Sequence, residues 1–161
     1  MQNGCLTEEM PTMPTNPYAL AKDTLRKLLQ ALQKKHSFSL KWARLFYMYG
    51  PRQNPNSLLA QLEHAINSGE SAFNMSGGEQ LRDYLPVETV ALYLVLLLEN
   101  ISYNGVVNIC SGKPISVRSL VEEFLTKRGV NIRLELGHYP YSENEPIAFW
   151  GSSRLFQQNE E

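Results

Sequence analysis

Helical and extended segments alternate along this 161-residue chain, and this alternation limits the folds that it can adopt. Apolar residues recur every three or four positions in four segments, which are predicted helices: 17 to about 36, 57–66, 88–100 and 116–128. Short apolar runs bounded by turn residues are predicted strands: 38–46, 71–75, 80–87, 106–110 and 131–136. Such an alternation is typical of an α/β fold with mostly parallel strands. The tail from Tyr139 has no clear period.

Composition indicates one globular domain and argues against two classes of partner. Hydrophobic residues make up 43% of the chain and charged residues 19%, which is enough apolar material for a core. The net charge is only -1 and the basic residues are scattered. We therefore expect no nucleic-acid-binding surface and no anionic-membrane surface.

Cysteine spacing and hydropathy favour a cytoplasmic protein without a structural metal. Cys5 and Cys110 lie far apart and form no zinc-binding pattern, so we expect reduced thiols and no metal site. No charged segment followed by an apolar stretch opens the chain, so no secretory signal is expected. The most apolar run, Val90 to Leu98, is too short to cross a bilayer and is predicted to be a buried helix.

A Tyr and a Lys stand four residues apart in the first turns of the first predicted helix. Asn16 is a good N-cap and Pro17 suits the first helical position, so the helix should begin there. Residues four apart are neighbours on a helix, which places the Lys22 ammonium near the Tyr18 phenol. A cation beside a phenol favours its ionised form, and such a pair can exchange a proton with a sugar hydroxyl or ketone. The alternative is a packed Tyr beside a solvated Lys, since this spacing also arises by chance.

The same helix carries leucines at helical spacing, and we expect the side that they form to be buried. These residues are Leu25, Leu28, Leu29 and Leu32.

Two further spots are candidate ligand sites. Tyr49-Gly50-Pro51-Arg52 follows a predicted strand and leads into a loop with Asn54 and Asn56, where open α/β sheets bind ligands; an ordinary connecting loop is the alternative. The planar guanidinium of Arg82 matches phosphate oxygens, although a structural ion pair with Asp83 is the alternative.

Four motifs in this order and spacing resemble the extended short-chain dehydrogenase/reductase family of nucleotide-sugar epimerases, dehydratases and reductases, and the match covers most of the chain. The motifs are Leu6 to Glu9 before Asn16 to Lys22, Arg44 and Phe46 before Tyr49-Gly50-Pro51, Gly78 and Arg82-Asp83 before Val87 to Ala91, and Asn108 to Gly112.

This resemblance implies a role for each candidate residue. Tyr18 would be the catalytic acid/base, and Lys22 would assist it and bind the nicotinamide ribose of NAD or NADP, so that both residues are also cofactor-binding. Arg82 would contact the diphosphate of a nucleotide sugar. Tyr47 stands where the family has a substrate-contacting Asn. The substrate-binding candidates are therefore Tyr47, Tyr49, Arg52, Asn56 and Arg82.

No Gly-x-x-Gly-x-x-Gly turn, which binds the cofactor pyrophosphate in this family, occurs in the chain. We therefore expect a single incomplete domain with a partial Rossmann-like fold that lacks the amino-terminal βαβ units. Residues 1–56 would end the Rossmann-like part, and residues 57–161 would mainly bind substrate. The chain alone would be inactive and would bind the cofactor weakly.

The resemblance leaves several readings of the chain open. It can be part of an enzyme for modified sugars of surface polysaccharides, a nucleotide-sugar-binding module without catalysis, or a truncated gene product. An open edge of the parallel sheet would favour association with another copy or with a complementary amino-terminal fragment.

Overall fold

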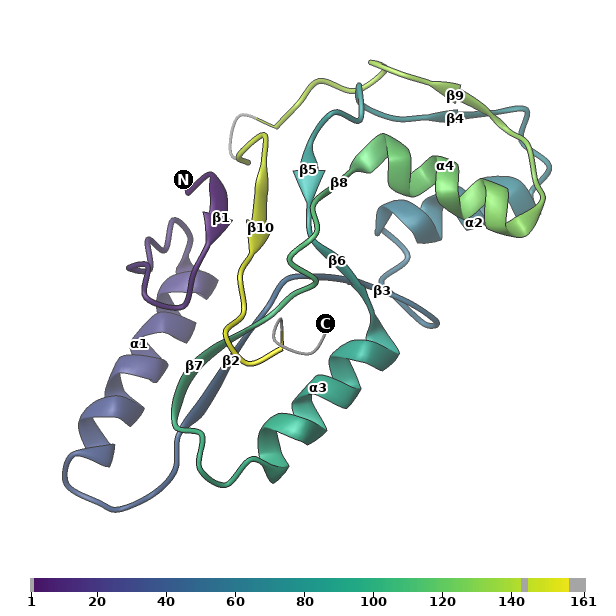
Figure 1. The fold of residues 1–161 in the computed structure, drawn as a ribbon. Helices are drawn as coiled ribbons and strands as arrows, with labels where there is room; N and C mark the ends of the chain where they lie inside the picture. The colour runs from purple at the N-terminus through teal and green to yellow at the C-terminus, as the bar shows by residue number, and fades with distance from the viewer. Residues whose placement is uncertain (1, 143–144, 157–161) are drawn as a thin grey trace.

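The computed structural model describes residues 2–142 and 145–156, and these residues form an α/β arrangement (Figure 1). The four helices are α1 (Pro17–Gln33), α2 (Leu58–Asn67), α3 (Val87–Glu99) and α4 (Val117–Arg128). The first five strands are β1 (Gly4–Leu6), β2 (Lys41–Leu45), β3 (Tyr47–Tyr49), β4 (Ala72–Asn74) and β5 (Leu81–Arg82). The other five are β6 (Tyr84–Pro86), β7 (Gly105–Ile109), β8 (Ile115–Ser116), β9 (Arg133–Glu135) and β10 (Phe149–Gly151).

The strands pair mostly in parallel, which confirms the predicted fold class. Four pairs are parallel, namely β1 with β10, β2 with β7, β3 with β6 and β4 with β9, whereas β5 and β8 pair antiparallel. The longest ladder joins β2 to β7 over five residues, from Lys41 opposite Gly105 to Leu45 opposite Ile109. Within the described part of the chain, β2 has no other strand partner, so its second edge is unpaired.

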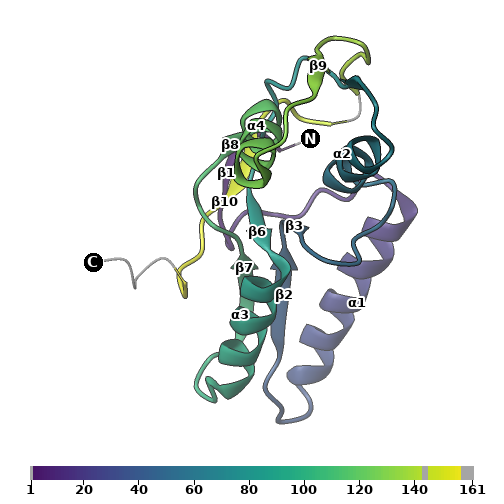
Figure 2. The same cartoon turned by 90° about the vertical axis from the view of Figure 1, so that its right-hand side faces the viewer.

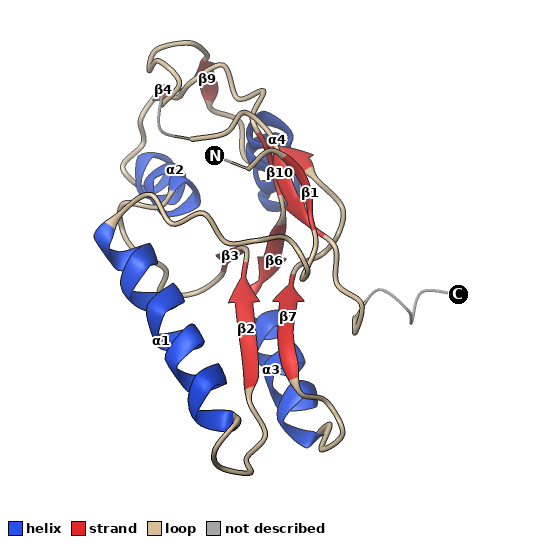
Figure 3. Cartoon of the chain, turned by 90° about the vertical axis from the view of Figure 1, so that its left-hand side faces the viewer, coloured by secondary structure: helices blue, strands red, loops and turns tan. Residues whose placement is uncertain are grey.

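Two helices cover opposite faces of the β2–β7 pair. Figure 3 shows the two strands face on, with α1 nearer the viewer and α3 behind them, and Figure 1 shows the same three layers from the side. One hydrophobic core lies between α3, β6 and β7. Its buried residues are Leu85, Val90, Leu97, Val107 and Ile109.

A second core lies between α2 and α4 and is closed by β4 and β9. Figure 2 shows α2 and α4 at one end of the molecule, near β9. Leu62 and Val121 are fully buried at its centre, and Phe73 and Met75 pack beside them. Strand β7 of the second predicted segment pairs with β2 of the first, so the two segments share a pair of strands, and the division of roles at residue 56 stays a prediction.

Local signals at the helix ends act as the sequence predicts. The Asn16 side chain accepts a hydrogen bond from the Ala19 N–H at 2.8 Å, so it caps α1. The last helix, α4, ends at Gly129, whose backbone is in the left-handed region (φ 63°), where glycine carries no Cβ penalty.

The predicted burial of the leucine side of α1 is wrong. Leu25, Leu28 and Leu32 are exposed, Leu29 is half-buried, and the one buried residue of α1 is Asp23. The helix therefore turns a polar side toward the strands and leaves its leucine side in solvent. The prediction of a buried helix over Val90 to Leu98 is also only partly right, because Val90 and Leu97 are buried while Leu92, Val95, Leu96 and Leu98 are exposed.

The strand predictions need correction in several places. The segment 80–87 forms two short strands, β5 and β6, because the chain changes partner at Asp83. In addition, β1 and β10 pair with each other in segments where no strand was expected. Each has only three residues, which is too short for a period to show in the sequence.

None of the helices among the described residues is long and apolar enough to cross a membrane.

Candidate active site

Tyr18 and Lys22 lie on the first two turns of α1, as the sequence predicts. The Lys22 Nζ atom is 5.7 Å from the centre of the Tyr18 ring, and both side chains are exposed. Tyr18 is 73% exposed, so the alternative of a packed Tyr beside a solvated Lys does not describe it. The phenol and the ammonium are therefore both accessible to a bound molecule.

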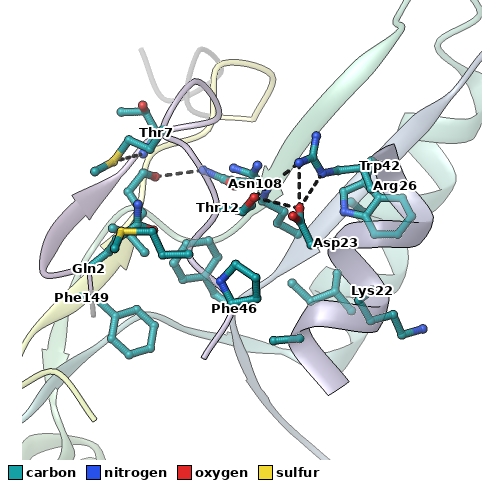
Figure 4. A pocket seen from close by; sticks show the side chains of 18 of the residues that line it. Gln2, Thr7, Thr12, Lys22, Asp23, Arg26, Trp42, Phe46, Asn108 and Phe149 are labelled. Atoms are coloured by element: carbon teal, nitrogen blue, oxygen red, sulfur yellow. Dashed lines mark hydrogen bonds and ion pairs between the residues drawn. The ribbon is translucent and has the colours of Figure 1, made fainter. Parts of the chain in front are cut away.

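Both residues line a cavity of about 820 Å³, which we call the Tyr18 pocket (Figure 4). One wall comes from the loop between β1 and α1, and another comes from β2 and the residues that follow it. Aromatic side chains occupy much of the second wall and the floor: Trp42, Phe46, Tyr47 and Phe149. A volume of this size is typical of sites for small molecules and cofactors.

A buried carboxylate at the base of the pocket fixes α1 to the preceding loop. Asp23 accepts hydrogen bonds from Thr12 Oγ1 at 2.8 Å and from Arg26 Nη2 at 2.7 Å, and its other oxygen pairs with Lys27 Nζ at 2.8 Å. The bonds from Lys27 and then Arg26 hold the pKa of Asp23 well below its ordinary value, despite the opposing effect of burial. Asp23 lies next to Lys22 in the chain, so this network fixes the helix turn that carries Lys22.

Arg82 is buried, at 3% exposure, behind the Phe149 side of the pocket. Its Nη1 atom donates to the carbonyl oxygens of Leu81 at 2.9 Å and Ile147 at 3.2 Å, and its guanidinium carbon lies 4.8 Å from the centre of the Phe149 ring. The Nη2 atom pairs with Glu145 Oε2 at 3.2 Å.

Asp83 does not form the ion pair with Arg82 that was the alternative to a phosphate site. Its carboxylate accepts instead from the backbone N–H groups of Ser111 at 2.7 Å, Gly112 at 2.9 Å and Gly151 at 3.1 Å. Asp83 is thus a structural junction between the β5–β6 bend, the turn after β7, and β10.

Tyr47 joins the Tyr18 pocket to the surroundings of Arg82. Its ring centre is 5.4 Å from that of Tyr84 and 5.9 Å from that of Phe149. Burial raises the pKa of Tyr84 to about 12, so Tyr84 stays neutral at physiological pH. The three rings form a continuous aromatic wall that runs from the pocket to Arg82.

The remaining predicted substrate residues lie away from the Tyr18 pocket. Tyr49 packs against the core between α2 and α4. Arg52 is exposed in the following turn with φ 61°, an unusual conformation for a residue other than glycine, and Asn56 lies in the turn before α2. Their neighbours Gln53 and Pro55 line a separate cavity of about 630 Å³. The structure therefore brings Tyr18, Lys22 and Tyr47 together, but not Arg52 and Asn56.

Several site residues escaped the sequence analysis. Asn108 lines the pocket, is 1% exposed, and donates from Nδ2 to the carbonyl oxygens of Leu6 and Ser152, both at 2.9 Å, so it joins β7 to two neighbouring segments. Its motif was noticed, but this role was not. Phe149 and Glu145 lie in the tail without a period, and no local pattern could have identified them. Asp23 did have a signal, since basic residues follow it at three and four positions, the spacing of helical ion pairs.

Comparison with known proteins shows the family of the chain. The family model described as the NAD dependent epimerase/dehydratase family matches residues 2–110. Among curated proteins, the dTDP-6-deoxy-L-talose 4-dehydrogenase (NAD(+)) of Aggregatibacter actinomycetemcomitans is 28% identical over 150 residues, which are 92% of this chain and 55% of that protein. The chain thus spans about half the length of the relatives that it matches.

Solved structures support the same fold. The UDP-N-acetylglucosamine 4-epimerase of Methanobrevibacter ruminantium, in complex with UDP-N-acetylmuramic acid, aligns with a TM-score of 0.83 and 27% identity over 92% of this chain and 48% of that one. The UDP-glucose 4-epimerase of Thermotoga maritima with UDP-glucose aligns with a TM-score of 0.81 and 22% identity over 96% of this chain and 50% of that one, which supports the fold alone. The predicted partial Rossmann-like fold is therefore confirmed. On this evidence the chain belongs to the NAD dependent epimerase/dehydratase family.

Proposed function

We propose that this chain is the carboxyl-terminal, substrate-binding part of an NAD(P)-dependent nucleotide-sugar epimerase, dehydratase or reductase. The observation that carries the proposal is the placement of Tyr18 and Lys22: the Lys22 Nζ atom is 5.7 Å from the centre of the Tyr18 ring, and both residues line a cavity of about 820 Å³. A phenol and an ammonium at the edge of one pocket form an acid/base pair that a sugar hydroxyl can reach.

Within this proposal Tyr18 moves the proton and Lys22 supports it electrostatically. The phenol oxygen gives a proton to, or takes one from, a sugar oxygen bound in the Tyr18 pocket, and the ammonium stabilises negative charge on that phenol. The nicotinamide cofactor, when bound, supplies or accepts the hydride. The exposed Lys22 ammonium, with its three donors, fits the hydroxyl groups of the cofactor ribose.

The other candidate residues are assigned to substrate binding, beginning with the aromatic wall and Arg82. Tyr47 and Phe149 offer flat apolar surfaces against which a sugar ring can pack. Arg82 lies behind Phe149, and we assign it to the diphosphate because a guanidinium binds phosphate oxygens in pairs. Tyr49, Arg52 and Asn56 are proposed to contact the substrate from the second cavity's side.

We further propose that the chain alone does not turn over substrate. Its sequence contains no Gly-x-x-Gly-x-x-Gly turn, so tight NAD(P) binding by these residues is not expected. The free edge of β2 and the exposed leucines of α1 favour association with a second copy or with a complementary amino-terminal part. Cys5 and Cys110 are both free, as is usual in the cytoplasm, where we place the protein.

A second candidate function is a nucleotide-sugar-binding module without catalysis. The absence of a Gly-x-x-Gly-x-x-Gly turn from the sequence supports this candidate as well. The second candidate differs from the first because it requires no acid/base role for Tyr18. The two candidates can be separated by adding a complementary amino-terminal part and measuring turnover. Turnover that appears with the wild-type chain and is abolished by Tyr18→Phe would support the first candidate and argue against the second.

Calorimetric titration of the chain with UDP-glucose, dTDP-glucose and NAD⁺ tests the shared claim of nucleotide-sugar binding. We expect at least one of the two nucleotide sugars to bind, no micromolar binding of NAD⁺, and a large loss of sugar binding in Arg82→Lys, which keeps the charge but loses the planar fork. Arg118→Lys, on the exposed surface of α4, is the matched control. Absence of binding by both sugars, or micromolar binding of NAD⁺, would contradict the proposal.

A further inference from the structure

The donors of Arg82 are divided between two kinds of partner. Nη1 is held by two backbone carbonyl oxygens, of Leu81 and Ile147, which belong to the strand region itself. Nη2 is held by the carboxylate of Glu145, a side chain that is 55% exposed. The Phe149 ring lies against the guanidinium at 4.8 Å.

This division leaves one approach by which an anion can reach Arg82. The guanidinium is 3% exposed, and among the described residues the two carbonyls and the aromatic ring are fixed parts of the fold. Glu145 is the remaining described partner, and its carboxylate belongs to an exposed side chain that can turn away into solvent. A ligand phosphate must therefore take the position of the Glu145 carboxylate.

We propose that Glu145 is an internal competitor for the anion site of Arg82, and that the diphosphate of a nucleotide sugar displaces its carboxylate on binding. This inference rests on the proposed function, because it concerns the same anion site. A carboxylate and a phosphate oxygen accept hydrogen bonds from a guanidinium in the same geometry, so one can replace the other.

The energetics favour exchange rather than a permanent pair. The Glu145 side chain is 55% exposed, so its carboxylate returns to water at little desolvation cost, while the incoming phosphate balances the charge of the buried Arg82. When Glu145 leaves, the hydrogen bonds to the two carbonyl oxygens keep Arg82 in place, so the ligand does not have to order that side chain. A diphosphate brings more negative charge than one carboxylate and gains more from the buried guanidinium.

Glu145 would then set both the affinity and the selectivity of the site. Neutral sugars cannot displace it, because nothing would then balance the charge of the buried Arg82. Ligands with a diphosphate can displace Glu145, but their affinity is reduced because they compete with its carboxylate.

Titrations of the full chain with inorganic pyrophosphate and with UDP-glucose test this inference. Glu145→Gln keeps the shape of the side chain and removes its charge, so pyrophosphate should bind it at least about fivefold more tightly than it binds the wild type. The matched control is Glu122→Gln, which neutralises a half-exposed carboxylate paired with Arg118 on α4 and should leave the affinity unchanged. The double variant Glu145→Gln/Arg82→Lys should lose the gain, and thermal melting checks that each variant is folded.

The two probes separate this inference from the proposed function. Tighter pyrophosphate binding that depends on Arg82, without any binding of UDP-glucose, would support the role of Glu145 and count against the nucleotide-sugar site. Binding of UDP-glucose that depends on Arg82, with unchanged or weaker pyrophosphate binding in Glu145→Gln, would overturn the inference alone. No pyrophosphate binding by any folded variant would overturn it as well.

Discussion

The carboxylate of Asp83 accepts a hydrogen bond from the backbone N–H of Gly151 at 3.1 Å, across 68 residues of sequence. The same carboxylate holds the turn after β7 through Ser111 and Gly112. Gly151 ends β10, the strand that begins with Phe149. Through this one buried side chain, the fold sets the position of the aromatic wall that runs from the Tyr18 pocket to Arg82.

Asp83→Asn should destabilise the chain by about 2–4 kcal/mol, because an amide has one acceptor oxygen and would leave at least one buried N–H group without a partner. Urea unfolding followed by circular dichroism measures the change. Glu70→Gln, at an exposed position, is the control and should stay within about 0.5 kcal/mol of the wild type. Equal stabilities of Asp83→Asn and the control would contradict the assigned role.

Asp23 should make the stability depend on pH in one direction. Its pKa is lowered in the folded chain, so its ionised form contributes stability above its ordinary pKa of 3.8, and this contribution is lost as the pH falls below that value. Asp23→Asn should therefore cost about 2 kcal/mol at pH 7 and progressively less below about pH 4. Urea unfolding of both proteins between pH 3 and pH 7 measures this difference. A gap that stays constant or widens toward low pH would refute the assignment.

The exposed leucines of α1 should promote association. We expect the wild-type chain to form larger species at micromolar concentration, and Leu28→Gln to reduce them without loss of stability, since Leu28 is 62% exposed. Leu136→Gln, at an exposed position outside α1 and just after β9, is the control and should leave association unchanged. Sedimentation velocity measures the species present. A monodisperse wild-type monomer would contradict this prediction and the proposed association through this side of the chain.

Gly151 should tolerate no side chain. A Cβ atom there would lie 2.5 Å from Cys110 Sγ and 2.9 Å from the Phe46 ring, closer than real contacts allow. Gly151→Ala should therefore cost about 1–3 kcal/mol through overpacking. Thermal melting, with Ser152→Ala as a neighbouring small substitution for comparison, measures the effect. An unchanged melting temperature in Gly151→Ala would show that this junction is looser than the structure indicates.

The sequence predicts those parts of the structure that local chemistry determines. Asn16 and Pro17 begin α1, and Gly129 ends α4, because capping depends on residues within one turn of the helix end. The Tyr18 and Lys22 pair follows from helix geometry alone. The register of β1 with β10 does not, because each strand has three residues and they lie more than 140 positions apart.

Long-range contacts explain the other failures. A leucine stripe shows that one side of α1 is apolar but does not say what covers it, and the structure leaves Leu25, Leu28 and Leu32 in solvent. Likewise, Arg82 has an acidic neighbour in the sequence, yet its actual partner is Glu145, 63 residues away. Only the tertiary fold determines which of two carboxylates reaches the guanidinium.

The most direct test of the account is hydrogen exchange of the chain with and without saturating UDP-glucose or dTDP-glucose, read by mass spectrometry. If the Tyr18 pocket binds the sugar and Arg82 binds its diphosphate, amides in residues 17–23, 42–47 and 147–151 should exchange more slowly with at least one of the two ligands, whereas those of α4 should not change. Unchanged exchange in all three segments with both ligands, or protection confined to α4, would contradict it.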